Sequence, residues 1–177
     1  MKNIIFYKSN TGFTKKYVDM LENRISPLEV YPINKISKKL ILEADNIFYG
    51  GPIKNNVIEG LAKFLKKYKY MKNKNIFIFA TGIQPSSDDK RELVIMSNSL
   101  DSYHVRLYLV PGGLDINGMK FPKKQIMKIG FKLAAKKEGG DSRNLILNRI
   151  NERVDLVNNM ALDVMIDKFH AVNISKN

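Results

Sequence analysis

The chain of 177 residues contains no cysteine and no tryptophan. Without cysteine, the protein has no disulfides, no thiolate metal sites and no thiol nucleophile. No apolar run approaches the roughly 18 residues that a membrane span needs. The apolar stretch within the first ten residues is also too short for the core of a signal peptide. These absences predict a cytoplasmic protein, and peripheral attachment at the inner face of the membrane stays open.

Acidic residues are scarce as well, with 17 Asp and Glu against 30 Lys and Arg, which gives a formal net charge of +13. Such an excess attracts nucleic acid, an anionic lipid surface or an acidic partner. The lysines are spread along most of the chain, so a generally lysine-rich composition is the alternative explanation. The content of 44% hydrophobic and 27% charged residues is typical of a globular protein, and the length predicts one domain, residues 1–177.

Short apolar runs alternate with helical patterns along the chain. The predicted strands cover residues 3–7, 28–33, 44–51, 74–82 and 103–110. The predicted helices cover residues 12–24, 57–70, 88–100 and 151–169. Asp89 and Glu92 form a capping-box pattern at the start of the third helix. The last helix is expected to bury Val154, Val157, Met160, Ala161, Val164 and Met165.

Alternating strands and helices predict an α/β fold with a doubly wound, five-stranded parallel sheet and helices on both faces. Residues 111–150 interrupt this alternation after the fifth strand. The stretch is too long for an ordinary connection, so it is interpreted as a functional insertion.

A cluster of small hydrogen-bond donors follows the first strand, where the first helix begins: Ser9, Thr11, Gly12 and Thr14. The backbone N–H groups of Asn10 to Thr14 have no intrahelical partners there, and the helix dipole adds positive potential. The pattern predicts a phosphate site with neutral donors. The G-x-x-x-x-G-K-[ST] motif is absent, and G-x-G-x-x-G does not follow the first strand. A phosphorylated receiver domain would need acidic residues at this strand end, and none is present.

Ser9-Asn10-Thr11-Gly12-Phe13-Thr14 resembles the [ST]-x-T-G-x-T phosphate loop of flavodoxins. The resemblance implies bound flavin mononucleotide (FMN) and the strand order 2-1-3-4-5. It also implies that the loops after the third and fourth strands, "GGPIKNN" and "TGIQPSSDD", hold the two edges of the flavin ring. The ring contacts expected on this basis are Gly51, Pro52, Ile53, Lys54, Asn55, Thr81, Gly82, Ile83 and Gln84.

Two departures from the flavodoxin pattern bear on the redox chemistry. Neither ring loop contains the aromatic residue that flavodoxins commonly stack on the flavin, and the chain is basic, whereas electron-transfer flavodoxins are typically acidic. Positive charge near a reduced, anionic flavin stabilises it and raises its reduction potential. Lys54 is the lysine best placed by sequence for this role, and a solvated loop lysine is the alternative.

The insertion contains a basic amphipathic pattern. Residues 120 to 137 include seven lysines and no acidic residue, interleaved with apolar side chains. Such a helix is typical of anionic membrane surfaces and acidic partners. Lys124, Lys128 and Lys132 are the expected docking cations. The alternative is a core-packing helix with a solvated lysine face.

The order of motifs in the insertion is similar to that in the flavodoxin-type protoporphyrinogen dehydrogenases. The match rests on Gly112-Gly113, the basic helix and Gly139-Gly140-Asp141-Ser142-Arg143. It implies electron transfer between an organic substrate, such as a porphyrinogen, and a quinone at a membrane. Arg143 is the candidate for a substrate carboxylate, which an arginine binds bidentately.

Two rival interpretations stay open. One is a soluble flavodoxin-type electron carrier without its own substrate, and the other is a flavin-free basic module that binds nucleic acid. No aromatic-rich basic strand or recognition helix supports the second, so no specific nucleic-acid partner is expected. His104 and His170 have no companions for a metal site or a catalytic triad, so we expect neither.

Overall fold

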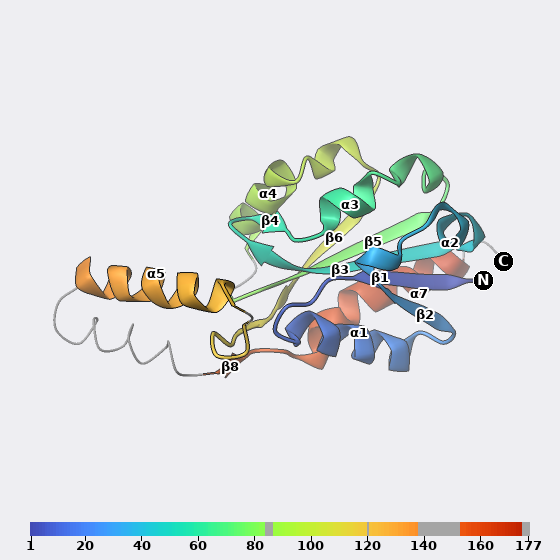
Figure 1. The fold of residues 1–177 in the computed structure, drawn as a ribbon. Coiled ribbons are helices and arrows are strands. Elements are labelled where there is room, and N and C mark those ends of the chain that lie inside the picture. Colours follow the sequence, from blue (N-terminus) through green and yellow to red (C-terminus); the bar gives the residue numbers. More distant parts are fainter. Residues whose placement is uncertain (84–86, 120, 138–152, 175–177) are drawn as a thin grey trace.

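The computed structural model describes residues 1–83, 87–119, 121–137 and 153–174. Its central sheet has the order β2-β1-β3-β5-β6, in which all neighbours run parallel (Figure 1). A sixth strand, β4 (Val57–Ile58), pairs antiparallel with β3. The predicted order 2-1-3-4-5 is therefore confirmed once this short extra strand is set aside. The parallel strands are β1 (Asn3–Tyr7), β2 (Leu28–Pro32), β3 (Asn46–Lys54), β5 (Asn75–Gly82) and β6 (Arg106–Pro111).

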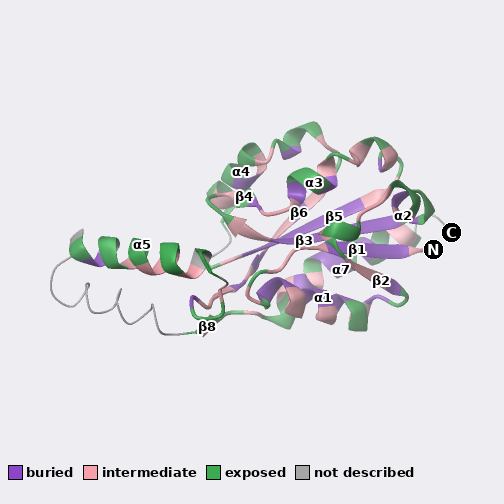
Figure 2. Ribbon diagram, in the orientation of Figure 1, coloured by how far each residue is buried: buried purple, intermediate pink, exposed green. Residues whose placement is uncertain are grey.

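Helices cover both faces of the sheet, as predicted (Figure 2). Helices α1 (Phe13–Arg24) and α7 (Asp163–Ile174) pack on one face, and α2 (Lys38–Glu43), α3 (Leu61–Leu65) and α4 (Asp88–Ser97) pack on the other. Successive residues of β1 serve opposite layers: Ile4 belongs to the α2–α3–α4 side and Ile5 to the α1–α7 side. The 3-10 turns are η1 (Ile33–Lys35), η2 (Tyr68–Tyr70), η3 (Leu100–Ser102) and η4 (Asn159–Leu162).

Three asparagines form a ladder across the amino ends of the central strands. Asn3, Asn46 and Asn75 are register partners on β1, β3 and β5. The amide nitrogen of Asn46 donates to Asn3 Oδ1 at 2.8 Å, and the amide of Asn75 donates to Asn46 Oδ1 at 2.7 Å. Asn46 also donates to Asn173 Oδ1 of α7 at 3.2 Å. Asn46 is fully buried, so these bonds satisfy a group that would otherwise be costly to desolvate.

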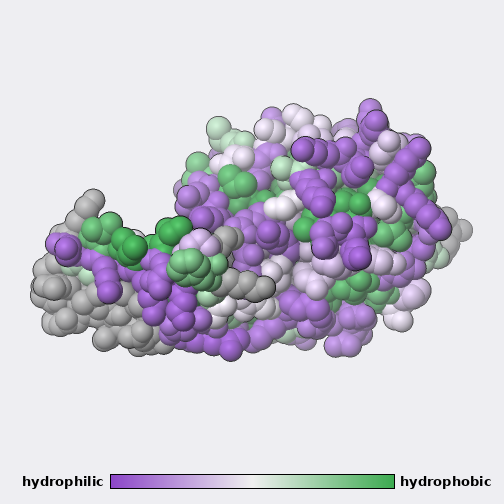
Figure 3. All heavy atoms as spheres, in the orientation of Figure 1, coloured by the Kyte–Doolittle hydropathy of each residue, from purple (hydrophilic) through white to green (hydrophobic). Residues whose placement is uncertain are grey.

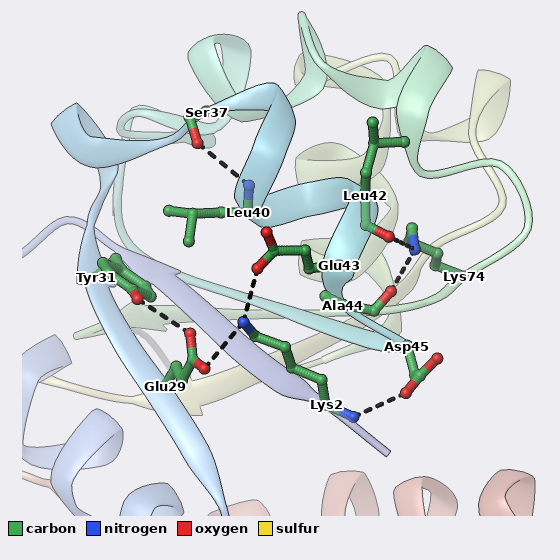
Figure 4. Close-up of polar contacts among 10 residues, drawn as sticks. All are labelled: Lys2, Glu29, Tyr31, Ser37, Leu40, Leu42, Glu43, Ala44, Asp45 and Lys74. Atoms are coloured by element: carbon green, nitrogen blue, oxygen red, sulfur yellow. Dashed lines mark hydrogen bonds and ion pairs between the residues drawn. The ribbon is translucent and has the colours of Figure 1, made fainter.

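Charged contacts fix α2 over the same end of the sheet (Figure 4). The ammonium of Lys2 lies 3.1 Å from Glu29 of β2 and 2.9 Å from Glu43 of α2. Lys74 donates to the carbonyl oxygens of Leu42, at 3.1 Å, and of Ala44, and so satisfies backbone acceptors at the carboxyl end of α2. Ser37 caps the other end, accepting from the N–H of Leu40.

The helix predicted over residues 57–70 is wrong in its first turn. Residues 57 and 58 form β4, and α3 covers only Leu61–Leu65. Asn55 and Asn56 have φ of 50° and 64°, which makes the β3–β4 connection a two-residue hairpin of the kind that asparagine favours. Gly60, at φ 84°, then turns the chain into α3.

The helix predicted over residues 151–169 begins later than expected. Residues 151 and 152 lie outside the described residues, β8 (Val154–Asp155) is extended, and α7 begins at Asp163. Of the side chains expected to be buried, only Met165 is fully buried, whereas Met160 and Val164 are 73% and 70% exposed. The inward face instead consists of Leu162, Met165, Ile166 and Phe169.

Smaller differences concern caps and lengths. Ser87, not the Asp89–Glu92 pair, caps α4 by accepting from the N–H of Lys90 at 3.1 Å. Helix α2 was not predicted, because its six residues are too few for a clear helical period.

The insertion leaves the sheet through a narrow neck, the two-stranded ladder of β7 (Gly113–Leu114) and β8. The predicted basic helix is present as α5 (Lys123–Lys137), which projects away from the domain (Figure 1). The neck pairs Gly113 with Asp155 and Leu114 with Val154. The segment that it encloses therefore ends a few residues later than the predicted limit of residue 150.

We expect Asn46→Leu to lower the free energy of unfolding by about 2–4 kcal/mol, because Oδ1 of the buried Asn3 loses its donor and the amide nitrogen of the half-buried Asn75 loses its acceptor. Urea denaturation would measure the loss. Asn34→Leu, on the exposed turn η1, is the matched control and should change stability by less than about 0.5 kcal/mol. Equal effects of the two substitutions would contradict a stabilising role for the ladder.

Candidate functional site

The loop between β1 and α1 contains a buried hydroxyl without a partner. The Oγ atom of Ser9 is inaccessible to solvent and makes no hydrogen bond. Asn10 is exposed, and its side-chain amide donates to Glu59 at 2.6 Å. Buried polar atoms in folded proteins are nearly always paired. An unpaired hydroxyl at this position therefore points to a ligand.

The amino end of α1 supplies backbone donors beside Ser9. The N–H of Lys16 donates to the carbonyl of Gly12 at 3.0 Å, so the N–H groups before Lys16 have no carbonyl one turn earlier. Gly12 has φ of 91°, and a Cβ there would meet nothing within 4 Å. Thr11 is half-buried in the same loop. Together these groups form a cradle of neutral donors at a helix amino terminus, which favours an anion.

Thr14 and Phe13 have side-chain roles that the sequence did not reveal. Thr14 is buried, and its hydroxyl lies 2.8 Å from the hydroxyl of Thr81 at the end of β5. This bond ties the first loop to the strand that leads into the next loop. The ring of Phe13 packs so closely on Gly113 that a Cβ there would lie 2.5 Å from it, and Arg153 lies over the ring at 5.6 Å. Phe13 can therefore offer a ligand its backbone but not its ring.

A cavity of about 380 Å³ opens at the carboxyl ends of β3, β5 and β6. Its size lies within the range of about 300–1,000 Å³ that is usual for small-molecule sites. The walls come from the β3–β4 hairpin, the end of β5, the outer strand β6 and the first turn of α4. The lining residues are Ile53, Asn55, Asn56, Ala80, Gly82, Ile83, Lys90, Leu109 and Val110.

The other residues expected to contact the flavin ring lie beside this cavity or outside the described residues. Gly51 packs against the chain beyond the hairpin, where a Cβ would lie 2.8 Å from the carbonyl of Glu59. Pro52 accepts from the N–H of Glu59 at 2.9 Å. Thr81, buried against Thr14, is also absent from the cavity wall. Gln84 lies outside the described residues.

Tyr49 of β3 supports the chain that follows the β3–β4 hairpin. Its buried hydroxyl donates to the carbonyl of Glu59 at 2.6 Å. Burial raises the pKa of the Tyr49 hydroxyl, so it remains a neutral donor across the physiological range. A Cβ on Gly60 would lie 2.4 Å from this oxygen, so the chain can pass over the tyrosine only as glycine.

Lys90, which was not predicted, lines the cavity and is the one cation among its described lining residues. It is half-buried in the first turn of α4, and its ammonium donates to Asn56 Oδ1 at 2.7 Å. Lys54 is exposed on the hairpin and is not part of the wall. Its position could have indicated this role, because Lys90 lies in the first turn of the helix that follows the second ring loop.

The insertion is anchored beside the cavity. The N–H of Gly112 donates to the carbonyl of Gly82, a cavity residue, at 2.7 Å. The Tyr17 hydroxyl donates to the carbonyl of Pro111 at 2.7 Å and accepts from the N–H of Asn158 at 3.0 Å, which joins the two sides of the neck to α1. Lys16 and Asp155 add an ion pair between α1 and β8.

The expected partner-binding residues lie apart from the cavity. Lys124, Lys128 and Lys132 are on α5, and Lys124 donates to the carbonyl of Asn117 at 3.2 Å. None of them lines the cavity. Arg143 lies outside the described residues.

A family model described as a flavodoxin domain matches residues 4–141. The chain belongs to this family. The match extends from β1 to the end of α5, so the flavodoxin domain includes the phosphate-type loop, the cavity walls and the projecting helix. A search of curated proteins gives no match.

Solved structures resemble this flavodoxin domain at low sequence identity. Smu.1420 from Streptococcus mutans UA159 is 16% identical, with a TM-score of 0.48 over 84% of this chain and 100% of its own. The Trp repressor binding protein from Bacillus subtilis is 12% identical, with a TM-score of 0.47 over 63% and 84%. The two-electron reduced flavodoxin from Megasphaera elsdenii is 14% identical, with a TM-score of 0.45 over 62% and 82%.

The described part of the chain lacks two further features, a metal-binding cluster and a membrane-spanning helix. Among residues 1–83, 87–119, 121–137 and 153–174, no group of three His, Cys, Asp or Glu side chains could hold a metal ion. None of the helices described there is long and apolar enough to cross a membrane.

We expect Tyr17→Phe to lower the free energy of unfolding by about 1–3 kcal/mol, because the carbonyl of Pro111 and the N–H of Asn158 both lose their partner. Urea denaturation would measure the change, and amide exchange should quicken at Asn158. Tyr31→Phe is the control, since among the described residues its hydroxyl bonds to the partly exposed Glu29 alone, and it should cost less than about 0.5 kcal/mol. Unchanged exchange at Asn158 would show that the hydroxyl does not hold the neck.

Proposed function

We propose that this flavodoxin domain binds FMN noncovalently at the carboxyl ends of β1, β3 and β5 and acts in electron transfer. The observation that carries the proposal is the buried, unpartnered hydroxyl of Ser9 beside the free amino end of α1. A phosphate monoester supplies acceptors that match these neutral donors. The cavity of about 380 Å³, which Gly82 lines next to the Thr81 partner of Thr14, gives room for an aromatic ring system.

The chain's own residues divide between the two parts of the ligand. Ser9, Thr11 and the N–H groups of Asn10 to Thr14 would hold the phosphate, and Thr14 would fix the loop through Thr81. Aliphatic side chains, among them Ile53 and Ile83, would exclude water from the ring. When bound, FMN supplies one- and two-electron redox chemistry, and the protein supplies orientation and electrostatics.

Within this function we favour an oxidoreductase over a soluble carrier without its own substrate. The insertion is anchored at Gly82, which lines the cavity. It therefore adjoins the site where a substrate would meet the flavin. A porphyrinogen donor and a quinone acceptor, as in the protoporphyrinogen dehydrogenase branch, are the substrates to test first. Anaerobic oxidation of protoporphyrinogen with a quinone would support that activity. Turnover only with a second redox protein would favour the carrier.

The phosphate loop makes a specific prediction about flavin selectivity. In calorimetric titrations FMN should bind at least about tenfold more tightly than riboflavin, because only FMN carries the phosphate. Ser9→Ala and Thr11→Ala should each weaken FMN binding by about 1–2 kcal/mol and leave riboflavin binding unchanged. Ser102→Ala, an exposed serine of η3, is the control. Equal affinities of the wild type for FMN and riboflavin would rule out the phosphate loop, and no flavin binding would rule out the proposed function.

Lys90 should set the reduction potential of the bound flavin. Lys90→Gln should lower the midpoint potential by an amount on the order of 1 kcal/mol per electron, because a positive charge beside the reduced, anionic form is removed. Lys54→Gln tests the earlier candidate, and its exposed position predicts a smaller shift. Spectroelectrochemical titration measures both variants. A larger shift for Lys54→Gln would reverse the assignment.

A further inference from the structure

Helix α5 presents an apolar stripe that is exposed among the described residues. Ile126, Ile129 and Leu133 are 63%, 56% and 54% exposed. Their spacing of three and four residues places them on one side of the helix. Gly130 lies on the same side, and a Cβ there would meet nothing within 4 Å. In the part of the chain that the structure describes, the stripe is therefore open along its length, and Phe121, just before the helix, is 80% exposed.

Positive charge borders this stripe. At about 100° per residue, Lys132 and Lys136 fall along one edge of it, and both are exposed. Helix α5 contains no acidic residue. Lys124 and Lys128 are half-buried, and Lys124 donates to the carbonyl of Asn117. The ammonium groups of Lys132 and Lys136 are therefore the more accessible to an anionic surface.

Exposed aliphatic side chains bordered by lysines match a surface that is apolar inside and anionic at its edge. We propose that α5 docks this flavodoxin domain on an anionic membrane surface, with the Ile126–Leu133 stripe in the lipid interface and Lys132 and Lys136 at the headgroups. An amphipathic helix with a basic polar edge binds in the plane of such an interface. Each lysine near the headgroups strengthens binding about fivefold. A second copy of this chain is disfavoured, because two lysine-bordered stripes repel each other.

The position of α5 suits a flat surface. The helix projects from the body of the domain, and apolar atoms gather along one edge of it in the space-filling view (Figures 1 and 3). The neck joins this arm to α1 through Tyr17 and to the cavity through Gly112 and Gly82. Docking through α5 would thus hold the cavity end of the sheet near the bilayer, where a lipid-dissolved redox partner resides.

Vesicle sedimentation with matched variants tests the proposal. The wild type should sediment with phosphatidylglycerol–phosphatidylcholine vesicles at low salt but not with pure phosphatidylcholine, and binding should weaken as salt rises. The double substitution Lys132→Glu and Lys136→Glu should weaken binding by at least about tenfold. Lys39→Glu with Lys72→Glu removes the same charge from exposed positions near α2 and η2, and it should retain most of the binding.

The apolar stripe needs its own pair of variants. Ile126→Ser with Leu133→Ser should weaken vesicle binding at least about tenfold, whereas Met160→Ser with Val164→Ser, equally exposed on η4 and α7, should not. Circular dichroism and FMN titration of each variant separate docking from folding and from cofactor binding, since docking needs no flavin. No sedimentation of the wild type at low salt would overturn the proposal. Equal losses of binding in the two lysine double variants would also overturn it, because they would show that net charge alone drives binding. Apolar variants that bind vesicles like the wild type would overturn it as well, because the lysines would then fit an acidic protein partner instead.

Discussion

The register of the parallel strands is the constraint on which the rest of the molecule depends. In a parallel sheet each strand is separated from its neighbours by a helix or a long connection, so no hairpin fixes the pairing. Asn3, Asn46 and Asn75 fix it here through side-chain bonds between register partners at the amino ends. A slip of one residue would break both bonds and would also exchange the two buried faces.

Correct register at one end of the sheet sets the geometry at the other. The carboxyl ends of β1, β3 and β5 then emerge together, and the loops that follow them become neighbours. The bond between Thr14 and Thr81 joins the first turn of α1 to the end of β5, although the two residues are far apart in the sequence. The buried hydroxyl of Ser9 and the cavity at Gly82 are therefore parts of one edge of the molecule.

The features that were predictable from the sequence are those whose cause is local. The apolar run of β1, the hydroxyl-rich turn into α1 and the lysine pattern of α5 each carry their own signal within a few residues. The hairpin at Asn55–Asn56 was missed because Ile58, Leu61 and Leu65 happen to follow a helical spacing. Strand β8 was missed because its partner lies on the far side of the insertion. Lys90 was missed because it comes from a different element than the loop whose Asn56 it bonds.

The closed neck has an evolutionary consequence. Because β7 and β8 bring the two ends of the insertion together, the segment between them is a loop whose closure is already fixed by the ladder and by Tyr17. The entropic cost of such a loop grows only slowly with its length. Lineages could lengthen, shorten or exchange this module while the sheet, the Ser9 loop and the cavity wall stayed the same. The neck thus separates, within one chain, a framework whose geometry must be kept from an arm whose length is free to vary.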